Sequence, residues 1–248
     1  MNYEFILKKI KKTESKIEKN RIFKKDSSFF KLKDNVFDVP TINLLSSLIN
    51  KRIISEIGGT IKIGKEANIY YAKNNSQELA IKIYRTNSNS IYSKSSYFIN
   101  KSKELKIKKK KDISFLLAKK EYKNLIRLYS LGLNVPKPIF IKRNILIMSF
   151  IGKNGIPYPQ LHDFKVNSSE TILKIFNSLF YLIRDIYQKS SLIHSDLSEY
   201  NILVDPITLN LTIIDVSQSI EKSNVNSCVF LNRDISILLN YFKKYNIY

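Results

Sequence analysis

The stretch at residues 192–204 reads LIHSDLSEYNILV and places three polar residues, His194, Asp196 and Asn201, between two apolar runs. The chain has only two histidines, and this one lies two residues before an aspartate that an asparagine follows five residues later. An aspartate can orient or deprotonate an attacking hydroxyl group. An asparagine oxygen can bind a hard cation such as Mg²⁺. Both residue types also cap turns, so the spacing alone leaves a purely structural role open.

The catalytic loop of protein kinases has this spacing, with His-x-Asp and then an asparagine five residues after the aspartate. Phosphoryl transfer also needs a second metal-binding carboxylate after a pair of strands. Asp215 ends the apolar run LTIID, 14 residues after Asn201. We therefore predict that Asp196 is the catalytic aspartate and that Asn201 and Asp215 bind Mg²⁺ or Mn²⁺.

Lys82 lies within the strand pattern LAIKIY, on the face opposite to Leu79, Ile81 and Ile83. Taken alone, such a lysine most often extends to solvent. Glu121, on the apolar stripe of a helix predicted at 113–131, changes this interpretation, because a buried carboxylate needs a partner. A strand lysine held by a helix glutamate is what the kinase pattern requires for contact with phosphate oxygens. An exposed glutamate at the edge of the stripe is the alternative.

The segment GGTIKIGKEANIY, residues 58–70, contains a glycine turn that differs from the usual kinase glycine loop and from a Walker loop. Its backbone N–H groups could still cover a triphosphate, and we assign Gly64 and Lys65 to ATP binding.

Composition limits the class of protein. The 248 residues are 44% hydrophobic, which is typical of a globular chain long enough for two lobes. One cysteine and two histidines exclude a disulfide framework and a structural zinc site. No apolar run approaches the roughly 18 residues that span a bilayer. We expect a protein without a membrane partner, in the cytoplasm, with the nucleus as a further location.

The net charge of +21 invites a nucleic-acid interpretation, since lysines that face phosphates drive binding. Most of the basic residues are lysine, however, and A+T-rich coding would produce the same bias. The lysine run at 106–111 is a candidate rRNA contact or a solvated loop.

The order of elements is strand-rich and then helix-rich. Predicted are a helix over 41–56, a β-hairpin over 58–85, two strands around the turn at 142–144, and a helix over 168–189. A short strand pair around 205–210 and a helix over 229–243 follow.

These elements predict an α+β, bilobal, protein-kinase-like fold of minimal size. Its N-terminal lobe would hold a twisted antiparallel sheet and one helix, and its shortened helical C-terminal lobe would lack an activation loop and a peptide-binding subdomain. The predicted domains are a basic extension at 1–40, an N-terminal lobe at 41–148 with a mobile basic insertion at 87–111, and a hinge with the C-terminal lobe at 149–248.

Several blocks resemble the signatures of the RIO family of atypical protein kinases, and they favour its type-one branch. They read GKEANIY, LAIKIYRT, KEYKNLIRL, NVPKPI, ILIMSFIG, IHSDLSEYNIL and IIDVSQSIE. Ser195 stands where that family usually has glycine, and Lys62-Ile63 replace its usual Ser-Thr.

The resemblance implies an ATP- and magnesium-dependent serine/threonine kinase and ATPase that acts late in small ribosomal subunit maturation, on pre-ribosomal particles and their rRNA. It implies that Lys82 contacts the ATP phosphates and that Glu121 holds it. Met148 would border the adenine pocket, and the backbones of Ser149 and Ile151 would bind the base. Asp215 would also be catalytic, as the acceptor in an aspartyl-phosphate intermediate.

Two other functions remain open on the sequence. A small-molecule kinase of the aminoglycoside or choline type shares the His-x-Asp core, but its cationic substrates call for an acidic pocket. A basic RNA- or ribosome-binding scaffold that uses ATP only as a switch is the non-enzymatic alternative.

Overall fold

A computed structural model of the chain describes residues 38–75, 77–86, 110–166 and 168–247. The predicted basic extension at 1–40 and the predicted mobile insertion at 87–111, with its lysine run, fall almost wholly outside these residues. The chain divides into two compact units, residues 1–119 with 139–150 and residues 120–138 with 151–248. The domain limits that the sequence suggested stay a prediction.

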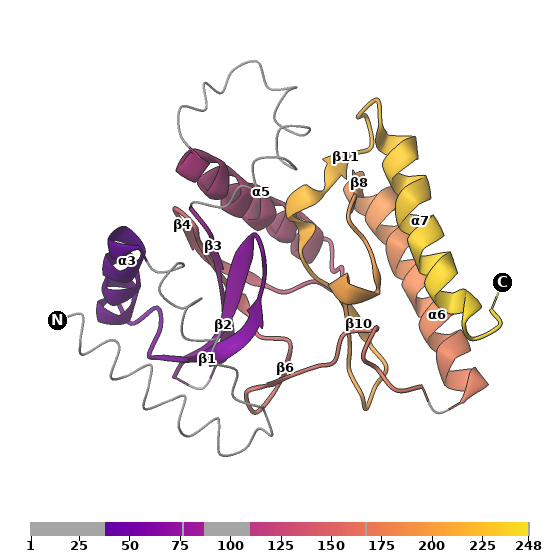
Figure 1. Cartoon of the computed structure of the whole chain (residues 1–248), viewed down its shortest axis with the longest axis horizontal. Coiled ribbons are helices and arrows are strands. Elements are labelled where there is room, and N and C mark those ends of the chain that lie inside the picture. The colour runs from indigo at the N-terminus through magenta and orange to yellow at the C-terminus, as the bar shows by residue number, and fades with distance from the viewer. Residues whose placement is uncertain (1–37, 76, 87–109, 167, 248) are drawn as a thin grey trace. The chain divides into compact units, whose positions relative to one another are not determined.

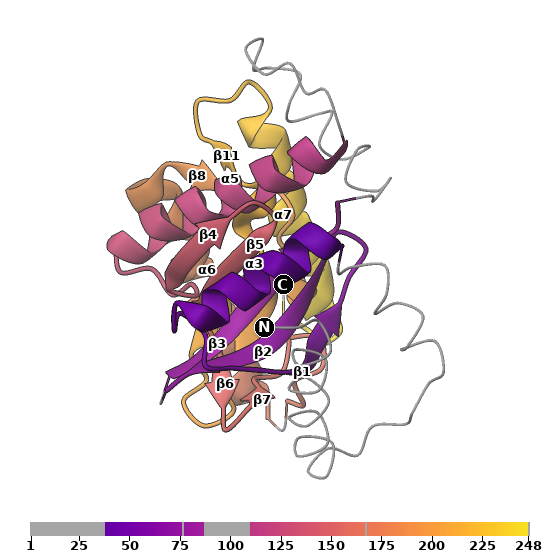
Figure 2. The ribbon, with the colours of Figure 1, turned by 90° about the vertical axis from the view of Figure 1, so that its left-hand side faces the viewer.

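The first unit is built on a five-stranded sheet in the order β1-β2-β3-β5-β4, whose first three pairings are antiparallel (Figures 1 and 2). Its elements are α3 (Val39–Asn50), β1 (Glu56–Ile63), β2 (Ala67–Asn74), β3 (Gln77–Tyr84), the first part of α5 (Lys110–Ser130), β4 (Pro138–Lys142) and β5 (Ile145–Ser149).

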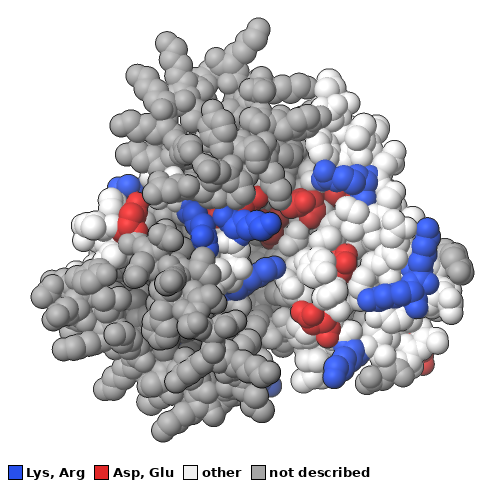
Figure 3. Space-filling view, viewed as in Figure 1, with Lys and Arg blue, Asp and Glu red and all other residues white. Residues whose placement is uncertain are grey.

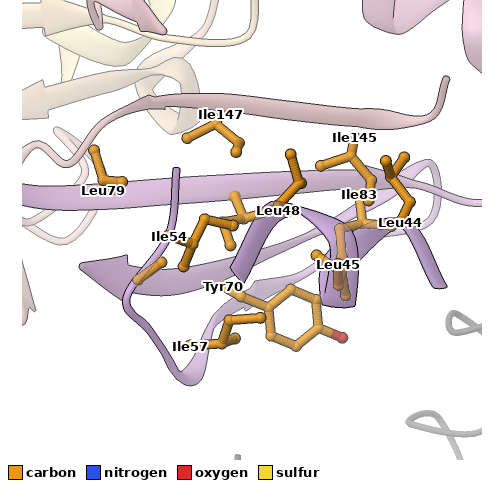
Figure 4. Close-up of a cluster of buried hydrophobic side chains, with 12 residues drawn as sticks. Leu44, Leu45, Leu48, Ile54, Ile57, Tyr70, Leu79, Ile83, Ile145 and Ile147 are labelled. Atoms are coloured by element: carbon orange, nitrogen blue, oxygen red, sulfur yellow. The ribbon is translucent and has the colours of Figure 1, made fainter. Parts of the chain in front are cut away.

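Helix α3 packs on one face of this sheet and forms its main hydrophobic core (Figure 4). Leu45 and Leu48 of α3 are each 1% exposed, and the side chains of Ile83 and Ile147 reach the same cluster from β3 and β5. The alternation of β3 sends Leu79, Ile81 and Ile83 to this face, as the sequence predicted. The opposite face buries Tyr84 against Ile113, Leu117 and Ala118 of α5.

A buried asparagine ties α3 to the sheet. The Nδ2 group of Asn144 donates to the hydroxyl of Thr41, at 3.1 Å, and to the carbonyl of Tyr84, at 3.0 Å. Asp38 caps α3 by accepting the backbone N–H of Thr41 at 2.9 Å. The helix is thereby held at its first turn both by its own cap and by the sheet.

The second unit is mainly helical and carries short strand pairs. Beyond the rest of α5 it contains β6 (Gly152–Lys153), β7 (Ile156–Pro157), α6 (Ser169–Asp185), a π-helical turn η1 (Ile186–Ser190), β8 (Leu192–Ile193), a 3-10 turn η2 (Glu199–Asn201), β9 (Ile202–Val204), β10 (Leu211–Ile213), a 3-10 turn η3 (Val216–Gln218), β11 (Ile220–Glu221) and α7 (Ser227–Lys243).

Helices α6 and α7 lie side by side (Figure 1), and the rings of Phe176 and Phe242 meet edge to face at 5.1 Å between centroids. The Ser168 side chain caps α6 by accepting the N–H of Thr171 at 3.1 Å. In the chain segment that connects these two helices, β8 pairs with β11 and β9 pairs with β10, both antiparallel. These two small ladders carry the loops of the candidate site.

Two predicted elements differ from the structure. The helix predicted over 41–56 ends at Asn50, and Glu56 already belongs to β1. The sequence indicated a glycine turn followed by a two-stranded hairpin over 58–85, whereas residues 56–63 form a third strand, β1. The register of β1 shifts between Ile57 and Thr60, where Gly58 and Gly59 lie. Glycines in a strand often mark such irregularities, so they were mistaken for a turn. None of the helices in the described ranges is long and apolar enough to cross a membrane.

Candidate active site

Lys82 occupies the middle strand of the first unit's sheet and is 5% exposed. In the ladders it stands opposite Ile69 of β2 and Leu146 of β5. Its Nζ lies 5.1 Å from the ring centroid of Tyr84, two residues further on the same face. The interpretation of Lys82 as a solvent-exposed strand lysine is therefore wrong.

The turn between β1 and β2 carries Gly64 and Lys65. The N–H of Gly64 donates to the carbonyl of Ala67 at 3.1 Å and lies 3.4 Å from the Oδ1 of Asn68. A Cβ atom at Gly64 would lie 2.7 Å from the Ala67 oxygen, so the tight turn requires a residue without a side chain. Lys65 follows with an exposed side chain.

The segment predicted to bind the adenine base begins in β5. Met148 is 7% exposed and stands opposite Ala80 of β3. Two residues after Met148, the N–H of Phe150 donates to the Glu78 carbonyl at 3.1 Å. In the second unit, the carbonyl of Ile151 accepts the N–H of Tyr158 at 3.1 Å. The predicted contacts of Ser149 and Ile151 with a base stay predictions.

Glu121 is buried in α5, with 1% of its surface exposed, so the alternative of a surface glutamate is wrong. It belongs to the second unit, whereas Lys82 belongs to the first. Their ion pair stays a prediction. What the two residues share is burial, which an ionised side chain tolerates only with polar partners.

Residues 192–204 form β8, the loop that carries His194, Asp196 and Asn201, and β9. His194 is 5% exposed and its Nε2 lies 3.0 Å from the carbonyl of Ile214. The Asp196 side chain is exposed, and its main-chain carbonyl accepts a 2.8 Å hydrogen bond from Nδ2 of Asn201. This bond turns the Asn201 amide so that its oxygen points away from that carbonyl.

Asp215 lies two residues beyond the end of β10, the strand that pairs with β9. The ladder sets Ile213 opposite Ile202, and the N–H of Ile214 donates to the carbonyl of Asn201 at 3.0 Å. Asp215 follows in a left-handed conformation, with φ 61° and ψ 60°. The Ser217 hydroxyl donates to its Oδ1 at 2.9 Å. The metal ligands predicted from a 14-residue spacing are thus brought onto neighbouring loops of one unit.

The two predicted ligands, Asn201 and Asp215, offer a cation one amide oxygen and one carboxylate. In the part of the chain that the structure describes, no three His, Cys, Asp or Glu side chains gather closely enough to hold a metal ion. Mg²⁺ is usually bound through one or two carboxylates together with substrate phosphates and water. Asn201 and Asp215 therefore fit a magnesium ion that arrives with a nucleotide, and they do not fit a resident structural metal.

Sequence analysis missed Asp234. It is 2% exposed on the buried side of α7, which also holds Leu238, Tyr241 and Phe242. Its two carboxylate oxygens accept the N–H groups of Ser195, at 2.7 Å, and of Leu197, at 3.2 Å. The signal was a carboxylate on an apolar helix face, the same signal that identified Glu121.

Burial raises the pKa of Asp234 above that of an exposed aspartate. Three influences act in the opposite direction and lower this pKa: the electrostatic interaction with His194, the two backbone N–H donors, and the Arg233 guanidinium. These partners thus stabilise the buried carboxylate of Asp234. Those groups belong to the loop around Asp196 and to the neighbouring residue on α7.

Comparison with known proteins shows which family this chain is similar to. The model of the RIO domain matches residues 68–248. The serine/threonine-protein kinase RIO1 of Chaetomium thermophilum is 36% identical over 230 residues, which cover 85% of this chain and 44% of that protein. The human protein of the same name is 32% identical over 256 residues, which cover 97% of this chain and 44% of that protein. The chain thus spans less than half the length of these two relatives.

A solved structure shows the fold. The Rio2 kinase of Chaetomium thermophilum, in a complex with ADP, Mg²⁺ and phosphoaspartate, superposes with a TM-score of 0.63 at 22% identity, covering 82% of this chain and 60% of that one. The predicted kinase-like fold, with an antiparallel sheet in its N-terminal part and helices beyond, is confirmed.

Proposed function

Because this chain belongs to the RIO domain family, we propose that it is an ATP- and Mg²⁺-dependent serine/threonine protein kinase with ATPase activity. The observation that carries this proposal is the placement of Asp196, Asn201 and Asp215 on adjoining loops. Nδ2 of Asn201 donates to the Asp196 carbonyl within one loop, and the N–H of Ile214, next to Asp215, donates to the Asn201 carbonyl. Related chains named serine/threonine-protein kinase support it. The alternative of a small-molecule kinase has no support from these relatives.

Each polar residue has a proposed task. Lys82 contacts ATP phosphate oxygens and is held by Glu121, while Gly64 and Lys65 cover the phosphates. Met148, Ser149 and Ile151 border and bind the adenine. Asn201 and Asp215 hold Mg²⁺, which would neutralise phosphate charge during transfer. Asp196 accepts a proton from the attacking hydroxyl group or water.

The finer proposal is that transfer proceeds through Asp215. A carboxylate oxygen of Asp215 attacks the γ-phosphorus, a new O–P bond forms, and the bond from that phosphorus to the β,γ-bridging oxygen breaks, so that ADP leaves. Water, deprotonated by Asp196, then cleaves the acyl phosphate and releases inorganic phosphate. The Rio2 kinase solved with ADP, Mg²⁺ and phosphoaspartate is the support for this step.

Labelling with ATP that carries a radioactive γ-phosphate, together with ATP turnover, tests both the proposed kinase activity and the proposed Asp215 intermediate. The wild-type chain should take up label that hydroxylamine removes, because acyl phosphates react with this nucleophile. Asp215→Asn should take up none, and Asp196→Ala should lose steady-state turnover while it remains folded. Full turnover in either variant would contradict the assigned roles. Label that persists in Asp215→Asn would indicate autophosphorylation on serine or threonine instead.

A role in late maturation of the small ribosomal subunit is a further part of the proposal, in the cytoplasm with the nucleus as a further location. Residues 1–37 and 87–109, which the structure does not describe, carry 17 lysines and arginines against six acidic residues, about half of the net charge. On the described part of the face in Figure 3, basic and acidic side chains are interspersed. We therefore place an rRNA contact in those two segments.

Pre-ribosomal RNA binding measured against salt concentration tests this placement. Deletion of residues 101–111 should reduce the slope of log K against log salt, because lysines that face phosphates release counterions. An unchanged slope would exclude that segment as the contact. RNA binding that survives Lys82→Ala and Asp196→Ala, in a chain without turnover, would favour the scaffold alternative.

A further inference from the structure

The carboxylate of Asp215, the proposed phosphate acceptor, is bound by a neighbouring hydroxyl group. The Oγ of Ser217 donates to the Oδ1 of Asp215 at 2.9 Å, and Ser217 is 1% exposed. Asp215 also holds the N-cap position of η3, yet no backbone N–H of this described turn donates to its side chain. Because an aspartate that only caps a turn accepts such an N–H, the hydroxyl contact indicates another role for this carboxylate.

The turn that presents the Ser217 hydroxyl is anchored from outside. The carbonyl of Val216 accepts Nδ2 of Asn124, from α5, at 2.8 Å and the N–H of Ser219 at 3.3 Å. β10 precedes the turn and β11 follows it, and each is paired in a ladder of the same unit. Asp215 itself has φ 61°, a conformation that a residue with a side chain keeps only where its surroundings enforce it. The hydroxyl and the carboxylate are therefore held next to each other.

The strength of this hydrogen bond depends on the charge of the carboxylate. Hydrogen bonds to an ionised acceptor are roughly twice as strong as those between neutral groups. In the proposed acyl phosphate, one oxygen of Asp215 carries the phosphoryl group and the other is a neutral carbonyl oxygen. When water cleaves the acyl phosphate, negative charge returns to that carbonyl oxygen, and the bond from Ser217 strengthens. A contact that is stronger in the transition state than in the ground state accelerates the step.

We propose that Ser217 is a catalytic residue that accelerates hydrolysis of the Asp215 acyl phosphate. This role of Ser217 rests on the proposed function, because it requires the Asp215 intermediate. The hydroxyl binds Oδ1, which becomes the carbonyl oxygen, so that Oδ2 attacks the γ-phosphorus. In the second step the oxygen of water bonds to phosphorus, its proton passes to Asp196, and the bond between phosphorus and Oδ2 breaks. The electron pair of that bond returns to the carboxylate, inorganic phosphate leaves, and the Ser217 hydroxyl keeps its proton.

Two variants and one control test this role in the full chain. Ser217→Ala removes the donor with little change in volume, and Ser217→Cys keeps the size of the side chain but offers only a weak donor. Ser219→Ala is the matched control. Ser219 belongs to the same segment and is 3% exposed, and its N–H donates to the Val216 carbonyl at 3.3 Å. Its replacement therefore measures the general effect of losing a buried serine hydroxyl from this segment.

The readouts are the rates at which label from γ-labelled ATP enters and leaves the hydroxylamine-sensitive form. Rapid quenching measures its formation, and a chase with unlabelled ATP measures its loss. Ser217→Ala should slow the loss by roughly five- to tenfold, which is the difference expected between a charged and a neutral hydrogen bond. Formation should change by less than about threefold, because the carboxylate gives up charge as it attacks. Ser217→Cys should lie between Ser217→Ala and the wild type, and Ser219→Ala should match the wild type in both rates.

A Ser217 that only supports the turn predicts the opposite pattern. Loss of its hydroxyl would then misplace Asp215, so formation of the label would slow and its loss would keep the wild-type rate. Either that pattern or wild-type rates for both steps in folded Ser217→Ala would overturn the role in hydrolysis. If Ser217→Ala does not fold, Ser217→Cys decides the question by the same two rates. Slower loss in Ser217→Cys supports the role, and an unchanged loss overturns it.

Failure of the proposed function has a different signature. A wild-type chain that turns over ATP without hydroxylamine-sensitive label would contradict the Asp215 intermediate and, with it, the role of Ser217. A wild-type chain with neither turnover nor label would contradict the kinase function and the role of Ser217 together. A wild-type chain that carries the label, while Ser217→Ala loses it at the wild-type rate, would contradict the role of Ser217 alone.

Discussion

The side-chain amide of Asn201 donates a 2.8 Å hydrogen bond to the main-chain carbonyl of Asp196. The two ends of the motif are thus joined within one turn, which places the proposed metal ligand beside the proposed catalytic aspartate. Because Nδ2 of Asn201 makes this bond, the amide oxygen is the atom that would bind the proposed Mg²⁺.

Removal of the Asn201 amide should make ATP turnover depend more strongly on the Mg²⁺ concentration. We expect Asn201→Ala to lower turnover at limiting Mg²⁺ by at least roughly 10- to 100-fold, the range found when metal sites lose a supporting partner. Excess Mg²⁺ should restore part of the loss. Asn210→Ala, in the exposed turn between β9 and β10, is the control and should behave as wild type. A loss that is the same at every Mg²⁺ concentration would argue for a purely structural Asn201.

Gly64→Ala should weaken ATP binding, because its Cβ would meet the Ala67 carbonyl at 2.7 Å and the turn would have to open. We expect KM for ATP to rise about tenfold, which corresponds to about 1.4 kcal/mol. Gly59→Ala is the matched control, since a Cβ there meets nothing within 4 Å. Equal KM values for the two variants would remove the β1–β2 turn from the proposed phosphate site.

Lys120 should make the stability depend on pH in the alkaline range. Burial lowers its pKa from 10.5 to about 8, so the folded state disfavours the charged form. The cost is fully present below pH 8 and disappears as the pH rises from 8 to 10.5, because the unfolded chain binds more protons in that range. Lys120→Met should therefore raise Tm at pH 7 by more than at pH 10.5.

The exposed neighbour Lys119 supplies the control for that measurement. Lys119→Met should show the same difference from wild type at both pH values. A Lys120→Met chain whose Tm difference does not vary with pH would indicate that Lys120 is not buried as a charged group.

Asn144→Ala should destabilise the first unit. Asn144 is 1% exposed and supplies the donors to the Thr41 hydroxyl and the Tyr84 carbonyl. Loss of a buried hydrogen-bonding group costs about 1–3 kcal/mol, and Tm should fall by about 2–4 °C for each kcal/mol. Thermal unfolding measures the change. Asn177→Ala, on the exposed side of α6, should leave Tm nearly unchanged, and an equal fall in both variants would contradict the role of Asn144.

Local sequence determined much of this protein. The alternation in β3 predicted which side chains of 79–84 share a face, because strand side chains alternate whatever the neighbouring strands are. The five-residue spacing from Asp196 to Asn201 predicted that these two residues share one loop. The short β9–β10 pair predicted that Asp215 lies on a neighbouring loop. Both contacts are local, because they lie within one turn or one hairpin. The glycines of β1 were misread, because a glycine in a turn and a glycine in an irregular strand look alike without the partner strand.

Only the tertiary structure decided the long-range contacts. Ser195 and Asp234 are separated by 39 residues, and Thr41 and Asn144 by 103. Neither pair has a periodic signal, because a buried polar group requires a partner but the sequence does not say which one. The sequence marked Ser195 as unusual where glycine was expected. The fold supplied the reason that a serine can stand there, since α7 brings the Asp234 carboxylate and the Arg233 guanidinium to its two peptide groups.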